Sequence, residues 1–102
     1  MRVIFTPEAF EDLAAINLYL SQVTFLERAD GYVDDIIAEC YSLGEIPVRG
    51  ISRDDIRSDL RILGFRRSAA IAFLLEEDAV VIMGVFYGGQ DFESKIMTRL
   101  RD

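Results

Sequence analysis

Residues 60–87 have the sequence LRILGFRRSAAIAFLLEEDAVVIMGVFY, in which three apolar runs are separated by two short polar links. Apolar runs of this length, rich in branched and aromatic residues, predict β-strands. We therefore expect strands at 60–65, 68–75 and 79–87. The link Glu76-Glu77-Asp78 predicts a turn, so the last two strands should form a β-hairpin whose acidic turn opposes edge aggregation.

The residues before this stretch predict one strand and two helices. A short β-rich run at 3–5 is followed by Thr6 and Pro7, the pattern of a helix N-cap and first helical residue. Apolar residues then recur every three or four positions. Thr24 and Glu27 have capping-box spacing, which predicts a second helix immediately after the first. The short link predicts an antiparallel helical hairpin.

The second helix should end near Gly44, where a left-handed glycine is expected. Residues 44–52 are predicted as a loop, and Ser52-Arg53-Asp54-Asp55 has the pattern of a capped short helical turn. Asp91 is the predicted N-cap of a last helix at 92–100. The order β-α-α-β-β-β-α predicts an α+β fold, a helical hairpin packed on a small, mainly antiparallel sheet. A chain of 102 residues fits a single domain, 1–102.

Composition excludes several classes of site. Cys40 is the only cysteine and histidine is absent, so neither a disulfide nor a zinc site of ordinary His/Cys composition is expected. The formal charge of −7 argues against wrapping nucleic acid, because Lys and Arg supply most non-specific affinity. Without a long apolar run or a signal-peptide pattern at the start, we expect a cytoplasmic protein.

A basic segment precedes and enters the predicted sheet, and it contains six of the 11 basic residues: Arg49, Arg53, Arg57, Arg61, Arg66 and Arg67. Guanidinium groups suit bidentate recognition of carboxylates at interfaces, so these residues are candidate contacts for an acidic partner. The alternative is internal ion pairing with Asp54, Asp55 and Asp59. Further along, Gly88-Gly89 is expected to be a turn, Tyr87 a half-buried strand aromatic and Cys40 a core residue.

Three local patterns, in this order, resemble the RelE/ParE superfamily, the toxins of bacterial type II toxin–antitoxin modules. The first is Phe10-Glu11-Asp12-Leu13 with Ile16 and Tyr19, which is similar to the family's first helix. The second is the arginine-rich approach from Arg49-Gly50 to Leu60-Arg61. The third is Tyr87-Gly88-Gly89-Gln90-Asp91, similar to the family's final strand exit.

The two branches of this superfamily imply different chemistry. RelE-like members cut messenger RNA on the ribosome, which requires cationic groups at the phosphate and a proton-transfer residue. Here the strand at 69–75 has no charge where many members place an arginine, and Gly89-Gln90 replaces basic residues. ParE-like members poison DNA gyrase by protein–protein contact, which implies no cofactor, no metal and no catalytic residue.

The resemblance therefore favours a ParE-like toxin that inhibits gyrase, is neutralised by a ParD-like antitoxin and forms a hetero-oligomer with it. The six arginines together with Tyr87, Gln90 and Asp91 are the expected partner contacts. One alternative is a divergent messenger RNA endonuclease using Arg61, Arg66 and Tyr87. Another is a non-toxic member that binds only antitoxin.

Overall fold

The protein has three helices and five strands in the computed structural model, which describes residues 1–101. In chain order the elements are β1 Arg2–Phe5, α1 Pro7–Val23, α2 Leu26–Ser42, β2 Ile51–Ser52, β3 Leu60–Phe65, β4 Ala69–Leu75, β5 Ala79–Tyr87 and α3 Phe92–Leu100. This confirms the predicted α+β fold and its order, to which the two-residue β2 is added. The predicted bounds of β3, β5 and α3 are those observed.

The strands form one sheet in the order β1-β5-β4-β3-β2. Only β1 and β5 pair in parallel, so the sheet is mainly antiparallel, as predicted. The register places Leu60 opposite Leu74 at one end of β3 and Phe65 opposite Ala69 at the other. Ala69 also pairs with Tyr87, so the end of β3 and the end of β5 lie in the same row of the sheet.

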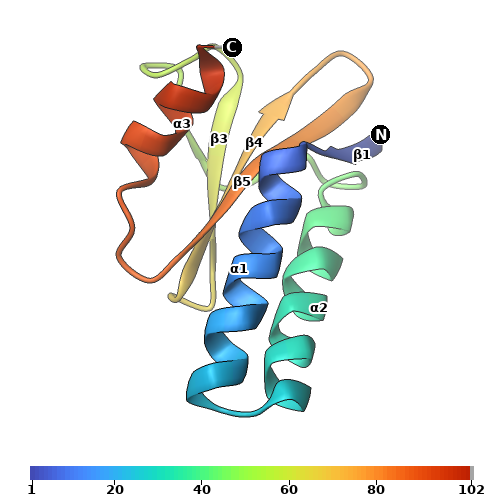
Figure 1. Ribbon diagram of the computed structural model, residues 1–102. Helices are drawn as coiled ribbons and strands as arrows, with labels where there is room; N and C mark the ends of the chain where they lie inside the picture. Colours follow the sequence, from blue (N-terminus) through green and yellow to red (C-terminus); the bar gives the residue numbers. More distant parts are fainter. Residues whose placement is uncertain (102) are drawn as a thin grey trace.

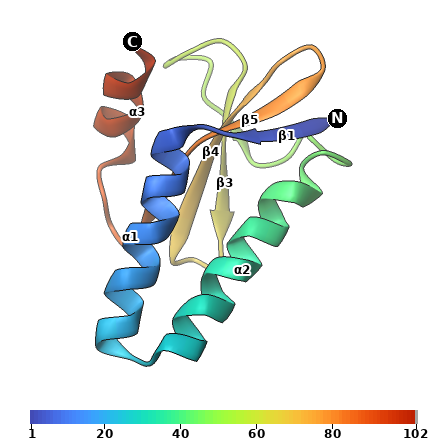
Figure 2. The ribbon, with the colours of Figure 1, turned by 45° about the vertical axis from the view of Figure 1, so that its right-hand side comes forward.

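The two faces of the sheet are covered by different helices. The antiparallel pair α1 and α2 packs on one face, where side chains such as Ile16, Ile36 and Phe73 form the main core (Figure 1). Helix α3 packs on the other face over a smaller cluster of Leu60, Ala72, Leu74, Phe86 and Ile96. The end of the helical hairpin where α1 turns into α2 extends past the strands in both views (Figure 2). Within residues 1–101, no helix has the length and apolarity needed to span a membrane.

A β-bulge in β5 changes which side chains face the helical hairpin. Ala72 pairs with Gly84 and Phe73 with Ile82, so Met83 has no opposite residue. Because one extra residue reverses the alternation of a strand, Ile82 and Val85 both face the helical hairpin although they are three residues apart. Gly84, the glycine in this otherwise apolar strand, lies directly after the bulged residue, as glycines in strands often do.

The predicted capping box at Thr24 is wrong. Helix α2 begins at Leu26, and its N-cap residue is Phe25, whose side chain makes no capping hydrogen bond. Thr24 is instead the C-cap of α1, where its N–H donates to the Leu20 carbonyl oxygen at 2.9 Å. Because only two residues separate the helices, Thr24 ends the first helix and Phe25 is left to begin the second.

The left-handed conformation predicted for Gly44 is also wrong. The glycines with positive φ among the described residues are Gly50 and Gly88, and Gly88 lies in the turn expected there. Gly44 is needed for a close approach instead, since a Cβ atom would lie 2.6 Å from the Met1 carbonyl oxygen. The amino group of Met1 donates to the Gly44 carbonyl oxygen at 2.8 Å, which fixes the start of β1 beside the end of α2.

Residues 51–52, predicted as the end of a loop, form β2. Ile51 pairs with Ile62 and Ser52 with Arg61, so β2 satisfies part of the outer backbone of β3 and forms the edge of the sheet. Ser52 therefore does not cap the following turn. That turn begins at Arg53, whose carbonyl oxygen accepts from the N–H groups of Ile56 at 2.9 Å and Arg57 at 3.2 Å.

Candidate partner-binding surfaces

Arg49 and Arg61 hold the loop before β2 against the rest of the molecule. Arg49 forms an ion pair with Glu39 on α2 and donates to Ser42 Oγ at 2.8 Å. Arg61 donates from Nε to the Arg49 carbonyl oxygen at 2.8 Å and from Nη2 to that of Gly50 at 3.1 Å. Both guanidinium groups are thus engaged within the chain.

Arg53 and Arg57 lie on either side of the turn between β2 and β3. Arg53 donates to both carboxylate oxygens of Asp55, at 2.9 and 2.8 Å, and reaches Glu93 on α3 at 3.4 Å. These bonds raise the pKa of Arg53 above its ordinary value. Arg53 is therefore paired within the chain, which was the alternative to a partner contact. Arg57 is exposed and forms no ion pair with any residue in 1–101.

Arg66 and Arg67 are the two central residues of the turn between β3 and β4. The Ser68 N–H donates to the Phe65 carbonyl oxygen at 2.9 Å, and φ is +48° at Arg66 and +58° at Arg67. Positive φ at both central residues defines a type I′ turn, a conformation that favours glycine and asparagine. Arg66 stacks on the Phe65 ring and pairs with Asp35 at 2.7 Å. Arg67 is exposed without an ion-pair partner in the described chain.

The basic segment is therefore not one basic patch. Arg57 precedes β3 and Arg67 follows it, so the six residues of the strand, roughly 20 Å in extended conformation, separate them. Of the six arginines predicted as contacts, these two are the ones that lack an ion pair or hydrogen bond from the guanidinium within residues 1–101. Their role in partner binding stays a prediction.

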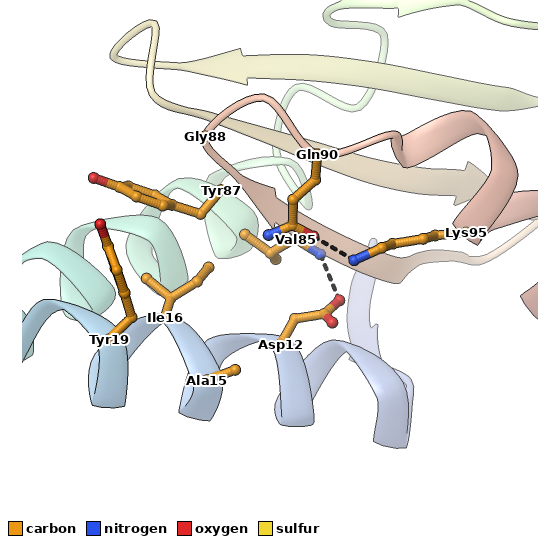
Figure 3. A pocket seen from close by; sticks show the side chains of 9 residues that line it. All are labelled: Asp12, Ala15, Ile16, Tyr19, Val85, Tyr87, Gly88, Gln90 and Lys95. Carbon is orange, nitrogen blue, oxygen red and sulfur yellow. Dashed lines mark hydrogen bonds between the residues drawn. The ribbon is translucent and has the colours of Figure 1, made fainter.

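A cleft of about 520 Å³ lies between α1 and the end of β5 (Figure 3). Its apolar wall contains Ala15, Ile16 and Val85, and the rings of Tyr19 and Tyr87 lie at one end. The rest of the lining is Asp12, Gly88, Gln90 and Lys95. Lys95 Nζ donates to Gln90 Oε1 at 2.7 Å, so the cleft has an aromatic end and a polar end. Its chemistry suits an apolar side chain with a polar tip.

The other predicted residues near the cleft have clear structural roles. Tyr87 is half-buried, as predicted, and makes an edge contact with Tyr32 at 5.7 Å between ring centroids. Tyr32 in turn bonds Ser68 Oγ at 2.5 Å, and burial raises the pKa of its hydroxyl. Asp91 caps α3, as predicted, by accepting from the Ser94 N–H at 3.2 Å. Hydrogen bonds from Ser94 lower the Asp91 pKa.

An ion pair that was not predicted from the sequence joins α1, β5 and α3. Arg99 donates to the two carboxylate oxygens of Asp12 at 2.7 and 2.8 Å, with 18% and 16% of these side chains exposed. Asp12 also accepts from the Val85 N–H at 2.9 Å. A Cβ atom at Gly84 would collide with the Arg99 guanidinium. The sequence contained one signal of this contact. A glycine inside an apolar strand, here Gly84, indicates that another group approaches the strand closely.

The net negative charge of the protein lies in the helical hairpin. Residues 7–42 contain eight acidic residues and one basic residue, a net charge of −7, which equals that of the whole chain. Glu39 pairs with Arg49, and the hydrogen bond from Arg49 is the main cause of the lowered pKa of Glu39. Cys40 is a core residue, as predicted, and burial raises its pKa to about 12, which leaves the thiol protonated and unreactive. The described residues include no His/Cys/Asp/Glu cluster suited to a metal.

Comparison with known proteins gives one family and one fold. The family model described as "ParE toxin of type II toxin-antitoxin system, parDE" matches residues 3–92. A solved structure titled "Chromosomal ParDE TA system from P. aeruginosa" is similar, with a TM-score of 0.75 and 22% sequence identity over 86% of this chain and 96% of that chain. At this identity the structural likeness concerns the fold. No curated protein matches the sequence.

Proposed function

Because the chain belongs to the family of ParE toxins of type II toxin–antitoxin systems, we propose that it inhibits DNA gyrase by binding and is neutralised by a ParD-like antitoxin. The match of the family model over residues 3–92 carries this proposal. In this mechanism the toxin stabilises gyrase on cleaved DNA, so replication stalls and growth stops. The protein acts in the cytoplasm, as a binding protein without a cofactor, and forms a hetero-oligomer with its antitoxin.

The placement of the candidate endonuclease residues supports binding over RNA cleavage. Acid–base and electrostatic catalysis requires the catalytic groups within hydrogen-bond reach of one phosphate. Tyr87 lies in the same row of the sheet as Phe65, two strands away from β3, whereas Arg61 is four residues further along β3, roughly 13 Å along the strand. Arg61 is also bonded to two carbonyl groups of its own chain. Arg61 and Tyr87 therefore do not converge on one site.

The part of the molecule outside the helical hairpin, residues 1–6 and 43–101, offers suitable surfaces for the antitoxin, and we call it the sheet half. Arg57 and Arg67 are cations without an internal partner among the described residues, and they fit carboxylates of an acidic antitoxin segment. The cleft beside Tyr87 and Gln90 accommodates an apolar side chain of the same segment. An antitoxin segment that runs along β3 would reach Arg57 at one end of the strand and Arg67 at the other.

Pulse labelling of bacteria in the minutes after induction of the toxin without its antitoxin tests the proposed target. We expect DNA synthesis to fall first and a DNA-damage response to follow. A fall in protein synthesis before DNA synthesis would contradict gyrase inhibition and favour cleavage of messenger RNA. Growth that continues unchanged would indicate a member of the family that binds antitoxin without being toxic.

A further inference from the structure

The end of the helical hairpin exposes an unusual amount of apolar surface. Within residues 18–26, five large apolar side chains are each 52–61% exposed: Leu18, Tyr19, Val23, Phe25 and Leu26. We call these five residues the hairpin tip. The end of the hairpin where α1 turns into α2 extends past the strands (Figures 1 and 2). Of the five residues, Tyr19 also contacts the sheet, because its ring centroid lies 6.0 Å from that of Tyr87. Clustered apolar side chains at the surface mark interaction sites more often than isolated ones do.

The backbone at the tip gives a second, independent indication. Phe25 occupies the N-cap position of α2, where serine, threonine, aspartate or asparagine would satisfy a free N–H group. Its side chain makes no capping bond and is 56% exposed, with Arg28 placed over the ring at 5.5 Å. The residue therefore contributes neither a cap nor a buried core contact. An exposed phenylalanine at this position is explained by a contact outside the chain.

The charge of the hairpin indicates the chemistry of the partner. Three of its eight acidic residues form ion pairs with the sheet half, which includes α3: Asp12, Asp35 and Glu39. The others form no ion pair within residues 1–101, and Arg28 is the one basic residue between positions 7 and 42. Asp30 and Asp34 lie on the first turns of α2, next to the tip. The surface that fits the tip is an apolar pocket with basic residues around it.

We propose that the hairpin tip is the surface that docks into gyrase, in an apolar pocket beside the basic surface with which the enzyme holds DNA. Proteins that grip DNA do so with basic surfaces, and the acidic hairpin is complementary to such a surface. The inference rests on the proposed function, since it names the toxin surface that contacts the proposed target. It also assigns the two partners to different surfaces, with the tip binding gyrase and the sheet half binding the antitoxin. Tyr19 lies at the border between them, since its ring also lines the cleft.

Substitution of Phe25 by serine gives a sharp test because stability and binding should change in opposite directions. Serine is a good N-cap, so Phe25→Ser should keep the melting temperature or raise it by about 4 °C. The same variant loses the exposed ring, and its inhibition of DNA supercoiling by purified bacterial gyrase should weaken by about tenfold, as for a central interface aromatic. The matched control is Ile46→Ser, an aliphatic residue 62% exposed beyond the other end of α2, which should inhibit like the wild-type protein.

A second variant, Leu18→Ser/Leu26→Ser, keeps the Phe25 ring and should weaken inhibition to a similar extent. Binding of the purified antitoxin should be unchanged in both tip variants. If the wild-type protein inhibits gyrase and both tip variants inhibit it equally well, the docking proposal is overturned and the proposed function stands. Loss of antitoxin binding, or dissociation of a toxin dimer, with gyrase inhibition intact would also overturn it. If the wild-type protein does not inhibit gyrase, the proposed function itself fails.

Discussion

The helical hairpin and the sheet half of this protein use charge in different ways. Outside residues 7–42, ten acidic and ten basic residues balance, and most arginines there bond to their own chain. The hairpin has a net charge of −7, and the apolar side chains of its tip are more than half exposed. The net charge of the whole chain thus conceals two surfaces of different character. An acidic region with an apolar tip and a neutral region in which Arg57 and Arg67 form no ion pair within residues 1–101 suit two different partners.

The largest expected effect comes from breaking the ion pair that joins the two regions. Asp12→Ala leaves Arg99 and the Val85 N–H without their partner in a mostly buried place. We expect the free energy of unfolding to fall by about 2–3 kcal/mol, because a buried charge without its partner is costly. Urea unfolding measures this change.

The matched control is Asp34→Ala, an exposed acidic residue of α2 that forms no ion pair within the described chain. It should change the free energy of unfolding by less than about 0.5 kcal/mol. Equal effects of the two substitutions would show that the Asp12–Arg99 pair does not connect the hairpin to α3.

A second effect concerns Arg57 and Arg67, the two arginines of the basic segment that form no ion pair within residues 1–101. Arg57→Glu and Arg67→Glu should each weaken antitoxin binding by about tenfold, because each places a negative charge against an acidic segment. Arg61 is a poorer choice, since its substitution would also release the loop at Arg49 and Gly50. Titration calorimetry with the purified antitoxin measures the affinity.

Arg2→Glu serves as the control for this pair, because Arg2 is an exposed arginine on the opposite edge of the sheet. Its affinity for the antitoxin should match that of the wild-type protein. If Arg57→Glu and Arg67→Glu also bind with unchanged affinity, the basic segment is not the antitoxin surface.

A smaller effect should depend on pH. The hydrogen bond from Arg49 lowers the pKa of Glu39 below its ordinary value of 4.5, so the folded state favours the carboxylate. This stabilisation is present above the ordinary pKa and is lost as the pH falls through the lowered pKa. At pH 7, Glu39→Gln should be less stable than the wild-type protein by about 0.5–1 kcal/mol, the upper part of the range for exposed pairs.

Urea unfolding at pH 7 and pH 3 tests this dependence. The stability difference between the wild-type protein and Glu39→Gln should shrink at pH 3, where Glu39 is increasingly protonated. Glu45→Gln, at an exposed position after α2, should show no such change. A difference that is the same at both pH values would contradict a role for the Glu39 charge in holding the loop before β2.

The smallest expected effect is that of Tyr87→Phe. The Tyr87 ring packs between Tyr19 and Tyr32, and the substitution keeps these contacts. Toxicity should be unchanged and stability should change by less than about 0.5 kcal/mol. A folded Tyr87→Phe variant without toxicity would instead give the hydroxyl a catalytic role and favour RNA cleavage.

Local patterns predicted most of the fold because each element has its signal in a few neighbouring residues. The Thr6 cap, the acidic turn at 76–78 and the Asp91 cap each act within one turn, and all three are observed. The α2 cap was predicted wrongly because Thr24 ends α1 and does not begin α2. The local spacing of Thr24 and Glu27 does not reveal this competition.

The candidate surfaces were harder to predict because they depend on contacts between distant residues. Asp12 and Arg99 are 87 residues apart, and only Gly84 gave an indirect signal of the space between them. The arginines were correctly seen as a basic segment, but sequence does not reveal that β3 would separate Arg57 from Arg67. The hairpin tip was missed because the exposure of its residues depends on where the sheet ends.

The most direct test of the account is a cleavage assay with purified bacterial gyrase, plasmid DNA and this protein. Gyrase held on cleaved DNA gives linear plasmid after denaturation and proteolysis. We predict that linear DNA accumulates as toxin is added and that the antitoxin prevents this accumulation. Gyrase that supercoils normally at every toxin concentration, together with cleavage of messenger RNA in a translating extract, would contradict the account.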